Sequence, residues 1–216
     1  GWLDQNPTAM GTNLGSADKY DIGHVFARYQ GGNAIGVGVL GSCCTLLKGR
    51  GCSAGYPPYE DDFFAIIGQE IGHQWNGGHT WAHCSPINNS GYTAGSACEP
   101  GGGTTIMSYS GSCGPDNVQN GFGDLYYNVC SIIEIRSFVE VGAGATCGAD
   151  ITTDNTAPIV TLPYANNFFI PISTPFELTG SAVDPDGDPL SYCWEGIDVG
   201  PLALLGSPVG STAIFR

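Results

Sequence analysis

One helix with an abrupt end constrains this chain more than any other feature. Asp61 or Asp62 can cap the start of a helix within residues 59–79, YEDDFFAIIGQEIGHQWNGGH. The sequence Asn-Gly-Gly at 76–78 predicts its end, because these residues tolerate the left-handed backbone that stops a helix. Between these signals, apolar side chains recur at helical spacing; they are Phe63, Ile66, Ile67 and Ile71.

Polar side chains on this helix are spaced so that they can bind one metal ion together. Gln69 and His73 are four residues apart, so they point into the same space, and Glu70 lies one step round the helix. Because the helix ends near Asn76, the chain can turn back and bring His79 toward the same point. A catalytic zinc ion usually has three protein ligands and a water. Gln69, His73 and His79 are therefore candidate metal ligands, and Glu70 can reach a water that the metal holds.

Four segments give the chain a resemblance to a known family. They make residues 20–140 similar to the bacterial reprolysin-like (adamalysin-type) metzincins, whose pattern is H-E-x-x-H-x-x-G-x-x-H followed by a methionine turn. Gln69 stands at the first histidine of that pattern, and Asn76 stands at its glycine. The segments are YDIGHVF (20–26), QEIGHQWNGGHTW (69–81), EPGGGTTIMSYSGSCG (99–114) and CSIIEIRSFV (130–139).

The resemblance implies a zinc-dependent endopeptidase with an α/β (α+β) fold, an active-site helix and a Met-turn. His73 and His79 would be zinc ligands, and Glu70 would be the general base that activates the attacking water and returns its proton to the leaving amine. Met107 would form the structural floor beneath the metal. Tyr109 matches a tyrosine that some metzincin families use to stabilise the oxyanion; ordinary packing is the alternative.

Gln69 leaves the state of the metal site open, because an amide oxygen is a weaker zinc donor than imidazole. Gln69 could coordinate with lower affinity or another metal preference, or it could leave two histidines to hold a metal loosely or not at all. His83 could also fill the gap, although it lies beyond the third-ligand position. The sequence thus supports either a working metalloendopeptidase or a pseudoprotease that serves as a binding or structural module of a bacterial surface protein. A third possibility is that Gln69 results from a deliberate or cloning-derived histidine-to-glutamine change in an active parent protein.

Other histidines and tryptophans near these motifs have simpler roles. His24 is expected to be structural, although it lies in a segment that resembles the family. Trp75 and Trp81 flank the metal motif and are expected to fill the core or line the cleft.

The nine cysteines, none of them in a C-x-x-C pair, favour disulfides and an extracellular setting. Adjacent Cys43 and Cys44 are expected to bond to different partners, and Cys193 stands apart as the expected odd thiol. Beginning at Gly1 without a signal peptide indicates a processed product or an excised fragment. We therefore expect a secreted or cell-surface protein.

The strong negative charge narrows the choice of partners. Acidic residues outnumber basic ones 20 to 6, which gives a net charge of −14. Such a balance disfavours nucleic acid and anionic membranes, and it is typical of a solubilising surface. No apolar run is long enough to span a membrane. The expected partner is a protein or peptide substrate.

Three further segments of the N-terminal two-thirds carry clear patterns. Residues 34–40, AIGVGVL, form a short apolar run bounded by glycines and predict a strand. Ser131 and Glu134 have the spacing of a capping box at the start of a second helix. Residues 80–103 are rich in Gly, Ser, Asn and Thr and predict an irregular segment.

The composition and residue pattern of the chain change after Cys147, which predicts more than one domain. We expect a metzincin-like metallopeptidase domain over residues 1–148, a polar linker over 149–157 and a partial immunoglobulin-like, all-β sandwich over 158–216. The last segment is shorter than the ~100 residues of a complete sandwich, so we expect residues outside this chain to complete it. Its resemblance to the C-terminal regions of large secreted bacterial proteins implies attachment at the cell surface.

One acidic turn in this last segment is a candidate calcium site. In DPDGDP, Asp184, Asp186 and Asp188 alternate around a glycine. Calcium prefers several oxygen ligands, but the run lacks the distal Glu of an EF-hand loop. A hydrophilic turn between strands is the alternative.

Overall fold

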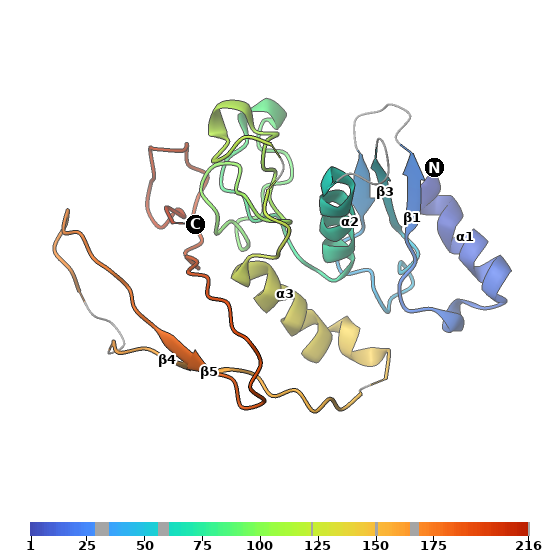
Figure 1. The fold of residues 1–216 in the computed structure, drawn as a ribbon. Helices are drawn as coiled ribbons and strands as arrows, with labels where there is room; N and C mark the ends of the chain where they lie inside the picture. Colours follow the sequence, from blue (N-terminus) through green and yellow to red (C-terminus); the bar gives the residue numbers. More distant parts are fainter. Residues whose placement is uncertain (29–34, 56–60, 122, 150, 165–168, 216) are drawn as a thin grey trace. The chain divides into compact units, whose positions relative to one another are not determined.

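The computed structural model describes residues 1–28, 35–55, 61–121, 123–149, 151–164 and 169–215 (Figure 1). The chain divides into two compact units. The first unit contains Gly1–Gly148 together with Glu195–Arg216, and the second contains Ala149–Trp194. Among the described residues, no helix is long and apolar enough to cross a membrane.

The first unit combines helices with a small mixed sheet, which agrees with the predicted α+β class (Figure 1). Its three strands have the order β1-β3-β2, with β1 parallel and β2 antiparallel to the central β3. In the described part of this unit, short 3-10 turns connect the longer elements: Ala17–Lys19, Ser85–Ile87, Gly114–Asp116 and Ala143–Thr146. The longer elements are α1 (Trp2–Leu14), β1 (Val25–Arg28), β2 (Gly36–Gly38), β3 (Gly51–Gly55), α2 (Asp61–Gln74) and α3 (Val129–Glu140).

Glycines in β2 let this strand lie very close to α2. A Cβ atom at Gly36 would lie 2.5 Å from Cγ of Glu70, and a Cβ at Gly38 would overlap the Glu70 carbonyl oxygen. The strand predicted for residues 34–40 is thus confirmed in its centre, while residue 34 lies outside the described part. Because glycine presents no side chain, the edge strand can pack directly on the helix at Glu70.

The predicted end of the helix is confirmed at Asn76, which has a left-handed φ of 73°. The N–H of Gly77 donates to the carbonyl of Gly72 at 2.9 Å, and the N–H of Asn76 donates to that of His73 at 2.8 Å. These two bonds form a Schellman motif, which satisfies carbonyls at the helix end. The predicted aspartate cap at the other end involves side chains outside the described part.

Helix α3 exists where the second helix is predicted, but the predicted capping box is wrong. Its N-cap is Asn128, whose side chain accepts a hydrogen bond from the N–H of Cys130. Ser131 lies inside the helix and is fully buried. Glu134 instead accepts a hydrogen bond from the N–H of Gly78. A distant backbone donor therefore replaces the local partner that the spacing predicts.

Three disulfides hold the first unit together, and all of them join distant segments; they are Cys44–Cys147, Cys84–Cys113 and Cys98–Cys130. The prediction that Cys43 and Cys44 bond to different cysteines is wrong, because Cys43 is a buried thiol. Burial raises the pKa of Cys43 to about 11, with a further contribution from the negative charge of Asp21. Cys52 and Cys193 also stand outside these disulfides.

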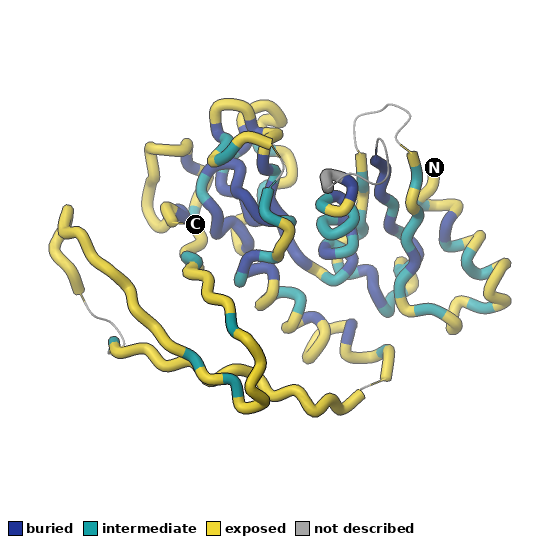
Figure 2. The backbone as a smooth tube through the Cα atoms, viewed as in Figure 1, coloured by how far each residue is buried: buried dark blue, intermediate teal, exposed yellow. Residues whose placement is uncertain are grey.

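The second unit contains little regular structure. Strand β4 (Ile159–Thr161) pairs with β5 (Ser181–Val183) in an antiparallel ladder, and most residues of the unit are exposed (Figure 2). Two short strands do not make a sandwich, so the immunoglobulin-like domain stays a prediction.

Residues Glu195–Arg216, which the sequence assigns to the sandwich, group with the first unit. The Glu195 carboxylate accepts a hydrogen bond from the N–H of Val129 at 2.7 Å. Ala203 and Ala213 are buried. An acidic side chain at a helix N-terminus is favourable, which gives this segment a physical reason to fold onto α3.

Candidate metal centre and active site

The structure brings His73 and His79 together at the end of α2. Their Nε2 atoms lie 3.0 Å apart, and the two rings are perpendicular with centroids 4.5 Å apart. His73 belongs to the last turn of the helix, and His79 returns to it after the Schellman motif at Asn76. The turn that the sequence predicts therefore supplies the geometry that points the two Nε2 atoms at each other.

Backbone carbonyls set the tautomer of both histidines. Nδ1 of His73 donates to the carbonyl of Gly77 and Nδ1 of His79 donates to that of Gly91, each at 2.7 Å. Since a carbonyl only accepts, both Nε2 atoms of the neutral rings direct lone pairs into the space between them. This is the usual arrangement of metal-binding histidines, whose other nitrogen bonds to the protein.

Burial keeps both imidazoles in the neutral form that binds metals. It lowers the pKa of His73 to about 4, with a further contribution from the charge of His79. Burial also lowers the pKa of His79, against the raising effect of its bond to Gly91. Two lone pairs facing each other repel unless a cation or a proton lies between them. The pair therefore fits two positions of a zinc site.

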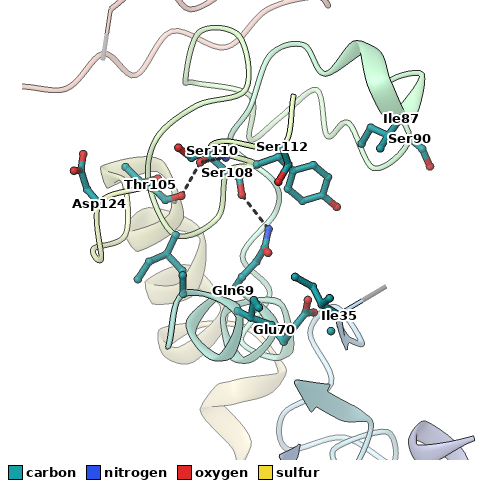
Figure 3. Close-up of a pocket in the computed structure, with 16 residues that line it drawn as sticks. Ile35, Gln69, Glu70, Ile87, Ser90, Thr105, Ser108, Ser110, Ser112 and Asp124 are labelled. Atoms are coloured by element: carbon teal, nitrogen blue, oxygen red, sulfur yellow. Dashed lines mark hydrogen bonds between the residues drawn. The ribbon is translucent and has the colours of Figure 1, made fainter. Parts of the chain in front are cut away.

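Gln69 reaches the neighbouring turn. Its amide Nε2 donates to the carbonyl of Ser108 at 3.2 Å, and Figure 3 shows the side chain rising from α2 toward that residue. Among the described residues, no third His, Cys, Asp or Glu joins His73 and His79 in a metal-binding group. The assignment of Gln69 as a third ligand therefore stays a prediction.

His83 does not complete the site. Its Nδ1 lies 3.0 Å from a carboxylate oxygen of Asp116, and its Nε2 lies 3.4 Å from the amide nitrogen of Asn89. Both ring nitrogens therefore face other partners, and the alternative that places His83 at the metal is wrong.

Glu70 is a buried carboxyl group beside the candidate metal ligands. Its side chain is 8% exposed. Burial raises the pKa of Glu70 to about 7, although a backbone hydrogen bond from Gly38 acts in the opposite direction. A carboxyl group with a pKa near neutrality can both accept and release a proton at physiological pH.

Met107 lies directly beneath the last turns of α2. It is fully buried, and a Cβ atom at Gly72 would lie 2.5 Å from its sulfur. The N–H of Thr80 donates to the Met107 carbonyl at 3.1 Å. Met107 thus packs below the helix and also bonds to the residue that follows His79.

The ring of Tyr109 packs against the ring of His79. Its ring centroid lies 4.6 Å from that of His79. Burial raises the pKa of Tyr109, and the charge of Glu70 raises it further. The phenol therefore keeps its proton at neutral pH and can donate a hydrogen bond.

A cavity of about 420 Å³ adjoins these groups, and Gln69, Glu70 and Tyr109 line it together (Figure 3). Its apolar wall includes Ile35, Ile66, Ile87 and Ile106. Hydroxyl groups of serine and threonine side chains also line it. A cavity of this size can hold a side chain of a bound peptide beside the candidate base.

His24 has the structural role that the sequence predicts. Its Nδ1 lies 2.7 Å from the amide oxygen of Gln74, and its Nε2 lies 2.9 Å from the hydroxyl of Ser53. Ser53 and Gln74 are fully buried. The imidazole of His24 therefore joins Gln74 of α2 to the buried Ser53 of β3.

The alternating aspartates of the second unit bond to the backbone around them. Oδ1 of Asp184 accepts the N–H groups of Asp186 and Asp188, at 2.8 and 3.2 Å. Asp186 accepts the N–H of Thr156 at 2.5 Å. These bonds are those of a polar turn. Calcium binding there stays a prediction.

Two carboxylates bond to the neighbours of His79, a role that the sequence spacing does not predict for either. Glu99 lies within the segment EPGGGTTIMSYSGSCG that resembles the family, and Glu134 lies in α3. Their hydrogen bonds to Thr80 and Gly78 appear only in the folded chain. The resemblance of their segments is the one signal that could have pointed to them.

Comparison with known protein families places most of the first unit in a family. Residues 4–136 match the family described as "Metallo-peptidase family M12B Reprolysin-like". The match covers well over half of the 216 residues and includes α2, both facing histidines and Met107.

Proposed function

The chain belongs to the reprolysin-like M12B metallopeptidase family, and from this premise we propose that it is a zinc-dependent endopeptidase acting on protein or peptide substrates. The observation that carries the proposal is the pair of buried imidazoles whose Nε2 atoms face each other at 3.0 Å. The buried Glu70 carboxyl group and Tyr109, whose ring packs against that of His79, both line the cavity.

His73 and His79 would hold the metal through Nε2, with the amide oxygen of Gln69 as the third protein donor. When bound, zinc lowers the pKa of a water molecule and polarises the carbonyl of the scissile bond. Coordination by the Gln69 oxygen is compatible with the bond from its nitrogen to Ser108, because the two atoms are separate ends of one amide. A neutral amide donates more weakly than imidazole, so we expect lower affinity than three histidines would give.

Glu70 would act as the general base. Its carboxylate oxygen accepts the proton of the attacking water and then delivers it to the nitrogen of the leaving amine. The contact with β2 restricts the position of this side chain, because a Cβ at Gly36 would lie 2.5 Å from the Glu70 carboxylate. Tyr109 would donate its phenolic hydrogen to the oxyanion that forms on the peptide carbonyl.

A second function, a pseudoprotease that binds a partner without cleavage, rests on Gln69. A proton shared between His73 and His79 would satisfy their facing nitrogens without any metal. The bond from Gln69 to Ser108 would then be purely structural. Such a chain would serve as a binding or structural module of a surface protein.

Metal binding and peptide cleavage distinguish these functions. We would equilibrate the purified chain with zinc, measure its stoichiometry, and assay internally quenched peptides with and without a chelator. The endopeptidase proposal expects one zinc per chain and cleavage that the chelator abolishes. Absence of zinc after equilibration, together with intact peptides, would favour the binding module. The same zinc measurement on the His73→Ala variant tests whether any bound zinc uses this site.

Secretion or display at the cell surface is part of the proposal. Three disulfides in the first unit support it, because oxidising compartments maintain such bonds.

A further inference from the structure

Carboxylates hold the residues on both sides of His79. The N–H of Gly78 donates to Oε2 of Glu134 at 2.8 Å. The hydroxyl of Thr80 donates to Oε1 of Glu99 at 2.6 Å. Glu134 belongs to α3 and Glu99 to an irregular segment, so two distant parts of the chain hold the neighbours of one histidine.

Glu99 connects the segment of His79 to the turn that precedes Met107. The carboxylate is fully buried. Its Oε2 accepts the N–H groups of Thr104 and Thr105, at 2.7 and 3.2 Å. The hydroxyl of Thr105 also donates to Oε1. Charge-assisted bonds to a buried carboxylate are stronger than neutral ones, so this group makes a rigid connection.

Glu134 holds the other neighbour of His79. Besides the N–H of Gly78, its carboxylate accepts the hydroxyl of Ser96 at 2.5 Å. A Cβ at Gly78 would overlap Ser96, so glycine is required for this close approach. Helix α3 thereby fixes the backbone just before His79.

His79 needs such contacts more than His73 does. His73 is fixed by the backbone of α2, whereas His79 lies outside any helix or strand. Metal ligands must be held to about 0.5 Å of their productive geometry, and loops do this poorly without support. We propose that Glu99 and Glu134 are positioning residues that hold His79 opposite His73 for metal binding. This inference rests on the proposed function.

Thr80→Val tests the Glu99 contact without changing charge. It removes the hydroxyl that binds Glu99 and preserves the shape of the side chain. Loss of such a supporting contact typically lowers metal affinity 10–100-fold, so we expect zinc affinity to fall about tenfold or more. Thr146→Val is the matched control, because it also removes a threonine hydroxyl, whose hydrogen bond to the carbonyl of Ala143 lies outside the Glu99 network. We expect its zinc affinity to stay within about threefold of the unaltered chain.

The Glu134 contact is tested by a pair of variants with equal charge. Glu134→Ala removes the acceptor for the N–H of Gly78, whereas Glu134→Gln keeps an amide oxygen in its place. A positioning role predicts about tenfold weaker zinc binding for Glu134→Ala and substantial recovery in Glu134→Gln. Glu140→Ala removes an exposed carboxylate from the same helix and controls for charge.

Two readouts keep the inference and the proposed function distinguishable. Zinc titration is combined with hydrogen exchange of the 77–81 amides in the metal-free, folded chains. Faster exchange in Thr80→Val and Glu134→Ala, but not in the controls, is expected together with weaker zinc binding. Unchanged exchange, unchanged zinc affinity, or equal losses in Glu134→Ala and Glu134→Gln would overturn the positioning role. If the unaltered chain binds no zinc, the proposed function fails, and the metal-positioning role fails with it. This holds even where hydrogen exchange shows that the two carboxylates hold residues 77–81 in place.

Discussion

The side-chain amide of Gln69 donates a hydrogen bond to the carbonyl of Ser108, the residue that follows Met107. The first ligand position of the metal motif is thus attached to the turn beneath the metal site. The nitrogen end of the amide is occupied, so in the proposed zinc site the oxygen would be the coordinating atom. The strength of the proposed site would then depend on one neutral donor and two imidazoles.

Restoring imidazole at this position should strengthen the site. We expect Gln69→His to raise zinc affinity about tenfold or more, because imidazole is the better zinc donor. Competition titration with a chelator of known affinity measures the change. Gln5→His, on the exposed part of α1, controls for the addition of a histidine. Equal affinities of the Gln69→His variant and the unaltered chain would mean that residue 69 does not limit metal binding.

Glu70→Gln should uncouple metal binding from cleavage. The amide has nearly the same size as the carboxylate but cannot accept the proton of the attacking water. General-base catalysis typically contributes about 100-fold or more, so we expect peptide cleavage to fall by at least that factor. The assay compares kcat/KM of the zinc-loaded variant with that of Glu140→Gln, which changes an exposed carboxylate. Cleavage that survives in Glu70→Gln would remove this residue from the mechanism.

Gly72→Ala should destabilise the first unit. The added Cβ would lie 2.5 Å from the sulfur of fully buried Met107, which has little room to move. Overpacking of this kind costs about 1–3 kcal/mol of unfolding free energy. Denaturant unfolding of the chain measures the loss. Gly11→Ala, which has open space around it in α1, should be neutral or slightly stabilising by comparison. Equal stability of the two variants would show that Met107 can move away.

Asp116 should make the chain sensitive to acid. Although burial acts to raise its pKa, hydrogen bonds from Ser85 and His83 lower it below the ordinary value. A lowered pKa contributes stability above the pKa of the unfolded chain, about 4, and this stability is lost as the pH falls through the folded value.

Asp116→Asn removes this dependence. We expect the variant to lose about 2 kcal/mol at pH 7, where the charged bonds are present, and little below pH 4. Urea unfolding at both pH values gives the comparison. Asp198→Asn, at an exposed position, is the control and should stay close to the unaltered chain at both. A loss that is equal at pH 7 and at acid pH would argue against the charge of Asp116.

Local patterns in the sequence determined the elements that carry the site. The helical repeat and the Asn-Gly-Gly stop predicted α2 and its end, because a helix and its Schellman motif depend on residues close in the chain. The spacing of His73 and His79 then predicted their meeting. Helix α1 carried no such signal, since Pro7, a residue that disfavours helix interiors, lies within it and Asn6 is its one buried residue.

Only the tertiary structure decided which polar groups bond to one another. Glu134 has the spacing of a local cap, yet it binds Gly78, while Asn128 and Glu195 serve the start of α3. Gln69 likewise takes its partner from a turn 39 residues away. A buried donor needs an acceptor, and which acceptors are near is fixed by packing between distant segments. The sequence therefore determined the helix and its candidate ligands, and the fold determined how the ligands are held.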